Sequence, residues 1–353
     1  MNRRDIGTDD PRVRVRPGKG SRPRTKNRPS HTDAVPAFVT EVDRGRFTAV
    51  TKSGTTVQAV KARSLGRKGV LVGDRVGLEG DVSGRRDTLA RIVTVEERRT
   101  VLRRSWDESD TGSKEKLIVA NATQMLIVTA GANPAPKRGM IDRAMAAAVT
   151  AGVKPVLVVT KTDLDPAHQL VEDYRRIGMP VYTTALPHTP SPDPQADLDG
   201  GEVPDKRGSN TTPATDLETI KTVLEGEITV LLGHSGVGKS TLINALVPGA
   251  QRVTGHVNAV TGKGRHTSSS ALALPLGHGW VIDTPGVRSF GLAQLDQDQL
   301  LEGFPELAQA AQDCPRGCTH LADSPDCCLD AREELRQRTI SFRNLVSQIL
   351  PAY

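Results

Sequence analysis

The chain has 353 residues, of which 47 are Lys or Arg and 41 are Asp or Glu, so its formal net charge at pH 7 is +6. This length predicts two or three domains that together bury a sizeable core. No long apolar run occurs, and the Arg-rich N-terminus lacks the apolar stretch of a secretory signal. We therefore expect neither a membrane span nor export, and place the protein in the cytoplasm.

The first 33 residues differ in composition from the rest of the chain. They carry ten Lys or Arg and four Asp or Glu, and so hold the whole formal excess of +6. They show no apolar periodicity and are rich in Pro, Gly and Ser. This composition predicts a disordered basic arm that binds nucleic-acid phosphates, with a merely solubilising tail as the alternative.

Residues 34–97 alternate short β-rich segments with turns, which predicts a small β-barrel domain that binds RNA. Phe38 and Phe47 are its only aromatic residues, so base stacking cannot dominate. The basic residues expected to contact RNA phosphates are Arg63, Arg67, Lys68 and Arg75. An exposed basic surface without a partner is the alternative. The polar residues 98–116 are expected to form a linker.

The segment 154–163 is an apolar, β-branched run that ends in Thr160-Lys161-Thr162-Asp163. The run predicts a strand, and the polar end resembles a guanine-reading motif with Thr160 where Asn is usual. Asp163 would accept hydrogen bonds from N1–H and N2–H₂ of guanine, which adenine cannot supply. The Lys161 stem would lie along the base. The alternative is a solvated polar turn.

A second guanine-contacting loop is expected at Thr184 and Ala185, after a short strand that begins near residue 181. The signal is the β-rich run 181–185.

A phosphate-binding loop follows later in the chain, between a predicted strand at 227–232 and a helix that begins near Ser240. The G-x-x-x-x-G-K-[ST] pattern turns backbone N–H groups toward phosphate oxygens. Lys239 would neutralise the β- and γ-phosphates, and the Ser240 hydroxyl would bind Mg²⁺. The alternative is a glycine-rich turn without a ligand. The expected contacts are Gly233, His234, Ser235, Gly236, Val237, Gly238, Lys239, Ser240 and Thr241.

The third motif, Asp283-Thr284-Pro285-Gly286, comes at the end of an apolar run. Asp283 would bind Mg²⁺ through water, and the Gly286 N–H would sense a γ-phosphate. The next residue is Val287, where Ras-like enzymes place a water-orienting Gln, so we expect slow intrinsic hydrolysis.

The first switch is expected around residues 265–269. Thr267, or alternatively Ser268 or Ser269, would complete the Mg²⁺ shell, and His266 would help to place water. An exposed loop residue is the alternative for His266.

The guanine-reading motif precedes the phosphate loop, although in an ordinary GTPase it follows that loop. This order predicts a circularly permuted α/β GTPase domain over residues 117–292, with a surface insertion at 188–213 that is rich in Pro and Asp. Permutation is physically reasonable because the termini of compact domains often lie close together. The alternatives are a P-loop kinase and a non-catalytic zinc- and RNA-binding protein. Nucleotide competition and labelled-GTP binding separate these classes.

All four cysteines of the chain lie close together near its C-terminal end. A cytosolic setting argues against structural disulfides and for a metal, and thiolates with one imidazole suit tetrahedral Zn²⁺. The expected ligands of one structural Zn²⁺ are Cys314, Cys318, His320 and Cys327. Cys328 competes for the fourth place, because one residue of the adjacent pair must point elsewhere. Buried cysteines without metal are the alternative.

Residues 293–353 are expected to form a mostly helical zinc-binding domain. Within it, residues 330–350 show helical spacing of apolar residues and should pack on the zinc element. These apolar residues are Leu335, Ile340, Phe342, Leu345 and Ile349.

The motif order and the cysteine cluster resemble the ribosome-small-subunit-dependent GTPase A (RsgA) family, from about residue 34 to the C-terminus. Further similar pieces are residues 117–121 and 264–267. Relative to the family's usual spacing, the first cysteine gap is one residue shorter and the last is one longer. The resemblance implies an OB-fold for the barrel, and GTP with Mg²⁺ as the nucleotide. It also implies the 30S subunit and its 16S rRNA as partners, and hydrolysis to GDP that the subunit stimulates. We expect a monomer.

Overall fold

The computed structural model describes residues 31–66, 69–104, 116–186, 217–247, 271–284, 292 and 295–349. Most of the expected basic arm and the whole expected surface insertion at 188–213 lie outside these residues. Within the described ranges, no helix combines the length and apolar character that crossing a bilayer requires.

The N-terminal part is a closed barrel in which β1 pairs with both β2 and β4. The strand order β1-β2-β3-β5-β4 with this closure is that of an OB-fold, which confirms the expected class. Side chains alternate between core and solvent, as in β3, where Val57 and Ala59 are buried. The elements are β1 (Val35–Asp43), β2 (Arg46–Thr51), β3 (Thr56–Lys61), the 3₁₀ helix η1 (Arg63–Leu65), β4 (Arg75–Gly80) and β5 (Ala90–Val95).

Neither aromatic residue of the barrel is available for base stacking. Phe47 is buried in the barrel core, and Phe38 stacks on Trp280, with ring centroids 4.7 Å apart. Any RNA contact of the barrel must therefore rely on polar and basic groups. Of the expected basic residues, Arg63 and Arg75 are exposed, whereas Arg67 and Lys68 lie outside the described residues.

The central domain is built on strands in the order β10-β9-β8-β11-β13-β12, in which only β12 is antiparallel to its neighbour. The middle strands β8 and β11 are continuous apolar or buried runs, because helices cover both faces of the sheet. The strands are β8 (Gln124–Ala130), β9 (Lys154–Thr160), β10 (Val181–Thr183), β11 (Ile228–Leu232), β12 (Leu272–Leu276) and β13 (Gly279–Asp283).

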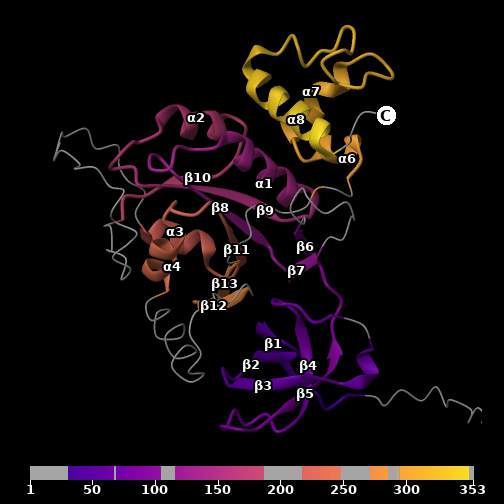
Figure 1. Cartoon of the computed structure of the whole chain (residues 1–353), viewed down its shortest axis with the longest axis vertical. Coiled ribbons are helices and arrows are strands. Elements are labelled where there is room, and N and C mark those ends of the chain that lie inside the picture. The colour runs from indigo at the N-terminus through magenta and orange to yellow at the C-terminus, as the bar shows by residue number, and fades with distance from the viewer. Residues whose placement is uncertain are drawn as a thin grey trace, which may run out of the picture. The chain divides into compact units, whose positions relative to one another are not determined.

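Within the described residues, α1 and α2 cover one face of this sheet, and α3 and α4 cover the other (Figure 1). Met125 and Ile127 pack with α1 and α2, whereas Leu126 and Val128 pack with α3 and α4. The alternation follows from the period of two along a strand. The helices are α1 (Arg138–Thr150), α2 (His168–Arg176), α3 (Leu217–Leu224) and α4 (Lys239–Leu246).

The segment between the barrel and the central sheet is not only a linker, because it contains a strand. β6 (Val101–Arg104) pairs antiparallel with β7 (Lys116–Ala120). Next to β7, Asn121 adopts a left-handed φ of 58° and donates from Nδ2 to the Gly73 carbonyl at 2.9 Å. Its Oδ1 accepts from the Arg99 N–H at 2.9 Å. The barrel and the central sheet are also joined where Glu41 of β1 pairs with Leu272 of β12.

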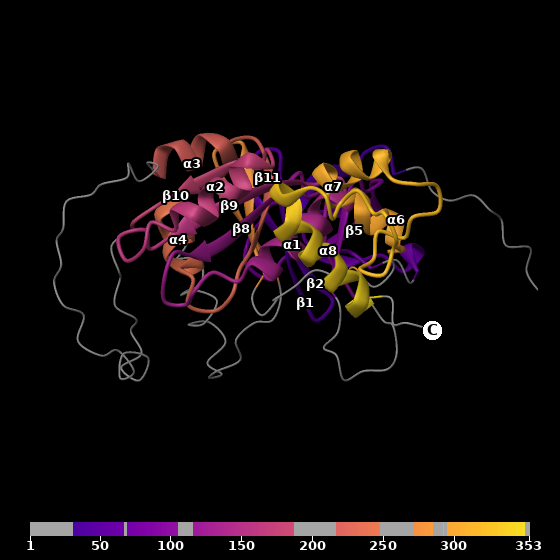
Figure 2. The same cartoon turned by 90° about the horizontal axis from the view of Figure 1, so that it is seen from above.

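The C-terminal part is mostly helical, as expected, and its helices gather into one cluster (Figure 2). Asp296 caps α6 through a capping box with Gln299. In α8, Phe342 and Leu345 are buried as predicted, but Ile340 is 44% exposed. The buried stripe instead runs through Arg338 and Thr339 at its N-terminal end. The elements are α6 (Gln297–Glu302), α7 (Pro305–Ala310), η2 (Ala311–Asp313), η3 (Glu333–Leu335) and α8 (Arg336–Ile349).

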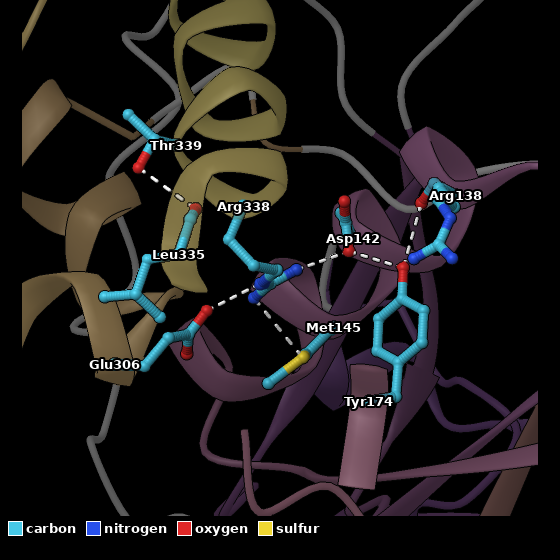
Figure 3. Close-up of polar contacts among 8 residues, drawn as sticks. All are labelled: Arg138, Asp142, Met145, Tyr174, Glu306, Leu335, Arg338 and Thr339. Carbon is cyan, nitrogen blue, oxygen red and sulfur yellow. Dashed lines mark hydrogen bonds and ion pairs between the residues drawn. The ribbon is translucent and has the colours of Figure 1, made fainter. Parts of the chain in front are cut away.

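A buried ion cluster connects α8 to the central domain (Figure 3). The Arg338 guanidinium pairs with Asp142 of α1 and with Glu306 of α7, the latter at 2.5 Å. Tyr174 of α2 donates its hydroxyl to Asp142 at 2.6 Å, and the Arg338 guanidinium lies 4.3 Å from the centroid of the Phe304 ring. Each charge in the cluster therefore has an opposite charge as a direct partner.

The cluster also sets the electrostatics of its members. Burial alone would lower the pKa of Arg338, but Asp142 and Glu306 raise it above its ordinary value. Burial and the Asp142 carboxylate both raise the pKa of Tyr174. Arg338 is thus held charged and Tyr174 neutral. A cavity of about 580 Å³ opens beside these residues, away from the loops that carry the nucleotide motifs.

Candidate functional site

The phosphate loop lies between β11 and α4, at the carboxyl ends of the parallel strands, as the sequence predicts. Gly236 and Gly238 have φ values of 80° and 89°, which side-chain-bearing residues rarely adopt. Gly238 is also the N-cap of α4, so the helix dipole and the free N–H groups of its first turn point to the loop. This is a ready anion site of the kind that binds phosphate.

Lys239 folds back onto its own loop, where its ammonium donates to the Gly233 carbonyl at 2.7 Å. Burial lowers the pKa of Lys239, and the nearby Asp283 opposes that effect. Burial likewise raises the pKa of Asp283, against Lys239 and a backbone hydrogen bond at Thr284. The two charges are therefore near each other and incompletely compensated. An incoming phosphate with Mg²⁺ would supply the missing partners of both.

Thr284 fixes the end of β13 next to the phosphate loop. Its hydroxyl donates to the Leu231 carbonyl at 2.9 Å, and both residues are buried. The rest of this motif, including Gly286, lies outside the described residues, as do Val287, His266 and Thr267 with their neighbours. Ser240 is exposed at the start of α4.

Thr160 connects the guanine-reading motif to the phosphate loop. Its hydroxyl lies 2.5 Å from the Val237 carbonyl and 3.2 Å from the Thr129 carbonyl. A hydroxyl has one proton to share between these two acceptors, whereas an Asn side chain would have two N–H groups. The replacement of Asn by Thr thus keeps the link between the two loops but leaves one donor fewer.

The neighbouring residues form a turn that faces the solvent. Lys161 has a φ of 54°, and its ammonium donates to the Asn133 carbonyl. Thr162 is half-buried, and its N–H donates to the Thr184 carbonyl at 3.4 Å, so the two expected guanine loops touch. Asp163 is exposed, which leaves its carboxylate open to a base.

One contributor was missed by the sequence reasoning. Residues 131–137 follow β8 and pack beside the phosphate loop, where they help to line a hollow of about 190 Å³ with His234, Ser235 and Val237. Lys161 reaches this segment through the Asn133 carbonyl. The only signal for it in the sequence is its place directly after a buried strand, at the end of the sheet where ligands bind.

The metal cluster has the donor set expected from the sequence. The ligand atoms of Cys314, Cys318, His320 and Cys327 all lie within 4.8 Å of one another. Three sulfurs and one imidazole at this separation fit a closed tetrahedral zinc site, in which metal–ligand bonds are about 2.0–2.3 Å long. The cluster thus suggests zinc binding.

The expectation of no disulfide is wrong for one pair of cysteines. Cys314 is bonded to Cys328, with Cα atoms 5.3 Å apart, while Cys318 and Cys327 are free thiols. The Cys314 sulfur therefore belongs both to the metal cluster and to a disulfide. As expected, the adjacent residues diverge: Cys327 lies toward His320, and Cys328 lies toward Cys314.

Helix α8 contacts the loop between η2 and η3, residues 314–332, which carries the cysteine cluster and is called the metal loop below. Arg343 donates from Nε to the His320 carbonyl at 2.9 Å. Its two terminal nitrogens pair with both oxygens of Asp330, at 2.7 and 2.9 Å. The expected contact between the last helix and the zinc element is present.

A permuted motif order, a doubly wound sheet with its phosphate loop between β11 and α4, and an OB-type barrel together define a circularly permuted GTPase. The family model for the RsgA GTPase matches residues 95–194 and 206–293, and the chain belongs to this family.

Named relatives agree with this placement. The chain is 33% identical over 289 residues to small ribosomal subunit biogenesis GTPase RsgA 2 of Bacteroides thetaiotaomicron, covering 79% of this chain and 82% of that protein. It is 35% identical over 291 residues to the RsgA protein of Chromohalobacter salexigens, covering 77% and 76%.

Solved structures share the fold. The crystal structure of YloQ, a circularly permuted GTPase, matches with a TM-score of 0.62 and 22% identity, covering 92% of this chain and 99% of that one. YjeQ from Thermotoga maritima matches with a TM-score of 0.64 and 22% identity, covering 90% and 99%.

Proposed function

We propose that this chain is a GTPase that binds the small ribosomal subunit, acts in its late maturation and hydrolyses GTP to GDP and phosphate. The observation that carries the proposal is the hydrogen bond from Thr160 to Val237, which joins the guanine-reading motif to the phosphate loop. The Lys239–Asp283 pair lies in the same site. Family membership and the named function of the relatives support the ribosomal role.

In this proposal each group would meet a defined part of the nucleotide. Lys239 would exchange the Gly233 carbonyl for the β- and γ-phosphates, and the Ser240 hydroxyl and Asp283 would hold Mg²⁺. The exposed Asp163 carboxylate accepts from N1–H and N2–H₂ of guanine. Magnesium supplies the positive charge that the phosphate oxygens need as the bond to the leaving group breaks.

The barrel and the basic residues are proposed to bind 16S rRNA. Arg63 and Arg75 are exposed and would contact phosphates, because the barrel aromatics are used in packing. The protein would act as a cytoplasmic monomer. Such phosphate contacts predict ribosome binding that weakens steeply as salt rises.

We also propose that Cys314, Cys318, His320 and Cys327 hold one structural Zn²⁺ in the reduced protein. The ion would fix the loop between η2 and η3, which otherwise has little regular structure. Equilibrium dialysis with elemental analysis should find one zinc for each reduced chain, and none after Cys318→Ser.

GTP turnover with and without isolated 30S particles tests the function most directly. Supplied activation is worth about 10³–10⁵ in rate in other GTPases. We expect slow turnover alone and stimulation of at least about tenfold by the particles. Transfer of phosphate to an acceptor, or no binding of labelled GTP, would overturn the proposal in favour of a kinase or a non-catalytic RNA-binding protein.

A further inference from the structure

Cys328 is the one cysteine that the zinc proposal does not use. Four ligand positions are filled by Cys314, Cys318, His320 and Cys327, which leaves a fifth soft donor beside a complete tetrahedral set. Cys328 has its own place in the fold, because its sulfur lies 3.2 Å from the Ala310 carbonyl at the end of α7. As a thiol it can donate to that carbonyl, so it needs no metal to be accommodated.

The Cys328 sulfur is bonded to one of the proposed zinc ligands, Cys314. Cys314 and Cys328 have Cα atoms 5.3 Å apart, within the range that a disulfide spans, and the structure joins them. Cys327 is buried and lies toward His320, with its sulfur 3.9 Å from Nδ1. Both members of the bonded pair are half-buried, so a small oxidant can reach them.

We propose that oxidation of Cys314 and Cys328 to a disulfide competes with zinc binding. The two reactions exclude each other because both use the Cys314 sulfur. This inference rests on the proposed zinc site. In the reduced protein the Cys314 thiolate is a zinc ligand and Cys328 is a thiol. In the oxidised protein Cys314 is bonded to Cys328, and two cysteines and one histidine remain for the ion.

The chemistry requires a two-electron oxidant, for which we name hydrogen peroxide. The Cys328 thiol loses its proton, and its sulfur attacks the peroxide oxygen, breaking the O–O bond and giving a sulfenic acid and water. The Cys314 thiolate then leaves zinc and attacks the Cys328 sulfur, forming the S–S bond. The departing hydroxide takes up a proton to become a second water. Two thiol sulfurs are oxidised, one peroxide is reduced, and Zn²⁺ is released unchanged.

The structural effect should be local. Arg343 fixes the His320 carbonyl and Asp330, so the loop remains attached to α8 when the ion leaves. Helix α8 in turn stays joined to α1 through Arg338 and Asp142. Oxidation should therefore change the metal loop without releasing the C-terminal helices from the central domain.

The experiment uses the full-length, reduced, zinc-loaded protein. Hydrogen peroxide is added, zinc release is followed with a chromogenic chelator, and disulfides are mapped by mass analysis of non-reduced peptides. We expect zinc release that tracks a Cys314–Cys328 linkage and is reversed by a thiol reductant with added zinc. Cys328→Ser should bind zinc normally when reduced and release it at least about tenfold more slowly. Cys328→Ala serves as the second variant if serine impairs folding.

Several outcomes overturn the inference, and each has a distinct meaning. Equal release rates from the wild type and Cys328→Ser, or a Cys318–Cys327 linkage, would show that Cys328 is not the partner. Loss of zinc from reduced Cys328→Ser and Cys328→Ala would make Cys328 a ligand. Absence of zinc from the reduced wild type would refute the zinc proposal itself, while GTP turnover with 30S particles would still test the GTPase proposal separately.

Discussion

The buried cation Arg338 and the half-buried cation Lys239 lie in opposite electrostatic environments. Arg338 has two carboxylate partners, an aromatic ring beneath it and a raised pKa. Lys239 has a backbone carbonyl, one nearby carboxylate and a lowered pKa. The charges of the first cluster are paired within the protein, whereas we propose that a ligand supplies the missing partners of the second. Charge compensation thus distinguishes a residue that joins α8 to α1 and α7 from the residues that we propose to bind a nucleotide.

The largest expected effect comes from Arg338→Met. This change leaves the buried Asp142 and the half-buried Glu306 without the cation they share, which typically costs about 3–5 kcal/mol. Chemical denaturation monitored by far-UV circular dichroism measures the loss, and the nucleotide affinity of the folded fraction should not change. A loss below about 1 kcal/mol would mean that the cluster does not hold α8 in place.

The matched change Lys239→Met should give the reverse profile. It removes a cation whose charged form burial already disfavours, so the free energy of unfolding should stay within about 1 kcal/mol of the wild type. GTP turnover should fall by about 10²–10³, because one charge-stabilising group is lost from the transition state. Turnover assays and denaturation on the same preparation check both halves. A large stability loss with intact turnover would reverse the distinction between the two cations.

A smaller effect is expected from Thr160→Ala, which removes the hydroxyl between β9 and the phosphate loop. The buried Val237 carbonyl would lose its partner, a cost of about 1–3 kcal/mol. Titration with a fluorescent GDP analogue should show part of that cost as weaker binding. Thr160→Ser, which keeps the hydroxyl, should bind the analogue as tightly as the wild type. If the alanine variant bound as tightly as the serine variant, the link would have no role in nucleotide binding.

The sequence was sufficient for the fold class, because its signals are local and strong. Buried β-branched runs, glycines and the motif order predict the permuted GTPase domain, and the alternation over residues 34–97 predicts the barrel. It was less informative for residues 98–116, whose polar composition predicted a linker although they contain strand β6. Strand β6 forms because it pairs with β7, and the amino-acid composition of a segment does not reveal its pairing partner.

The ion cluster shows why the remainder could not be read from the sequence. Asp142 lies in an Ala-rich helix and looks like an ordinary exposed acid until Arg338, 196 residues later, is known to face it. The opposite error occurred at Ile340, which matches the apolar spacing and was expected to pack, but is exposed. Thr160 departs from the usual Asn, yet its hydroxyl lies within hydrogen-bond distance of the Thr129 and Val237 carbonyls, with one proton to share between them.

The central proposal is that the exposed Asp163 carboxylate recognises guanine, in the same nucleotide site as Lys239 and Asp283. Competition binding of GTP and xanthosine triphosphate to the wild type and to Asp163→Asn tests this directly. We expect Asp163→Asn to lose at least about 10² in GTP affinity and to prefer xanthosine triphosphate, because its amide donates where the carboxylate accepted. An Asp163→Asn variant that binds GTP as the wild type does, with the same preference, would contradict the account.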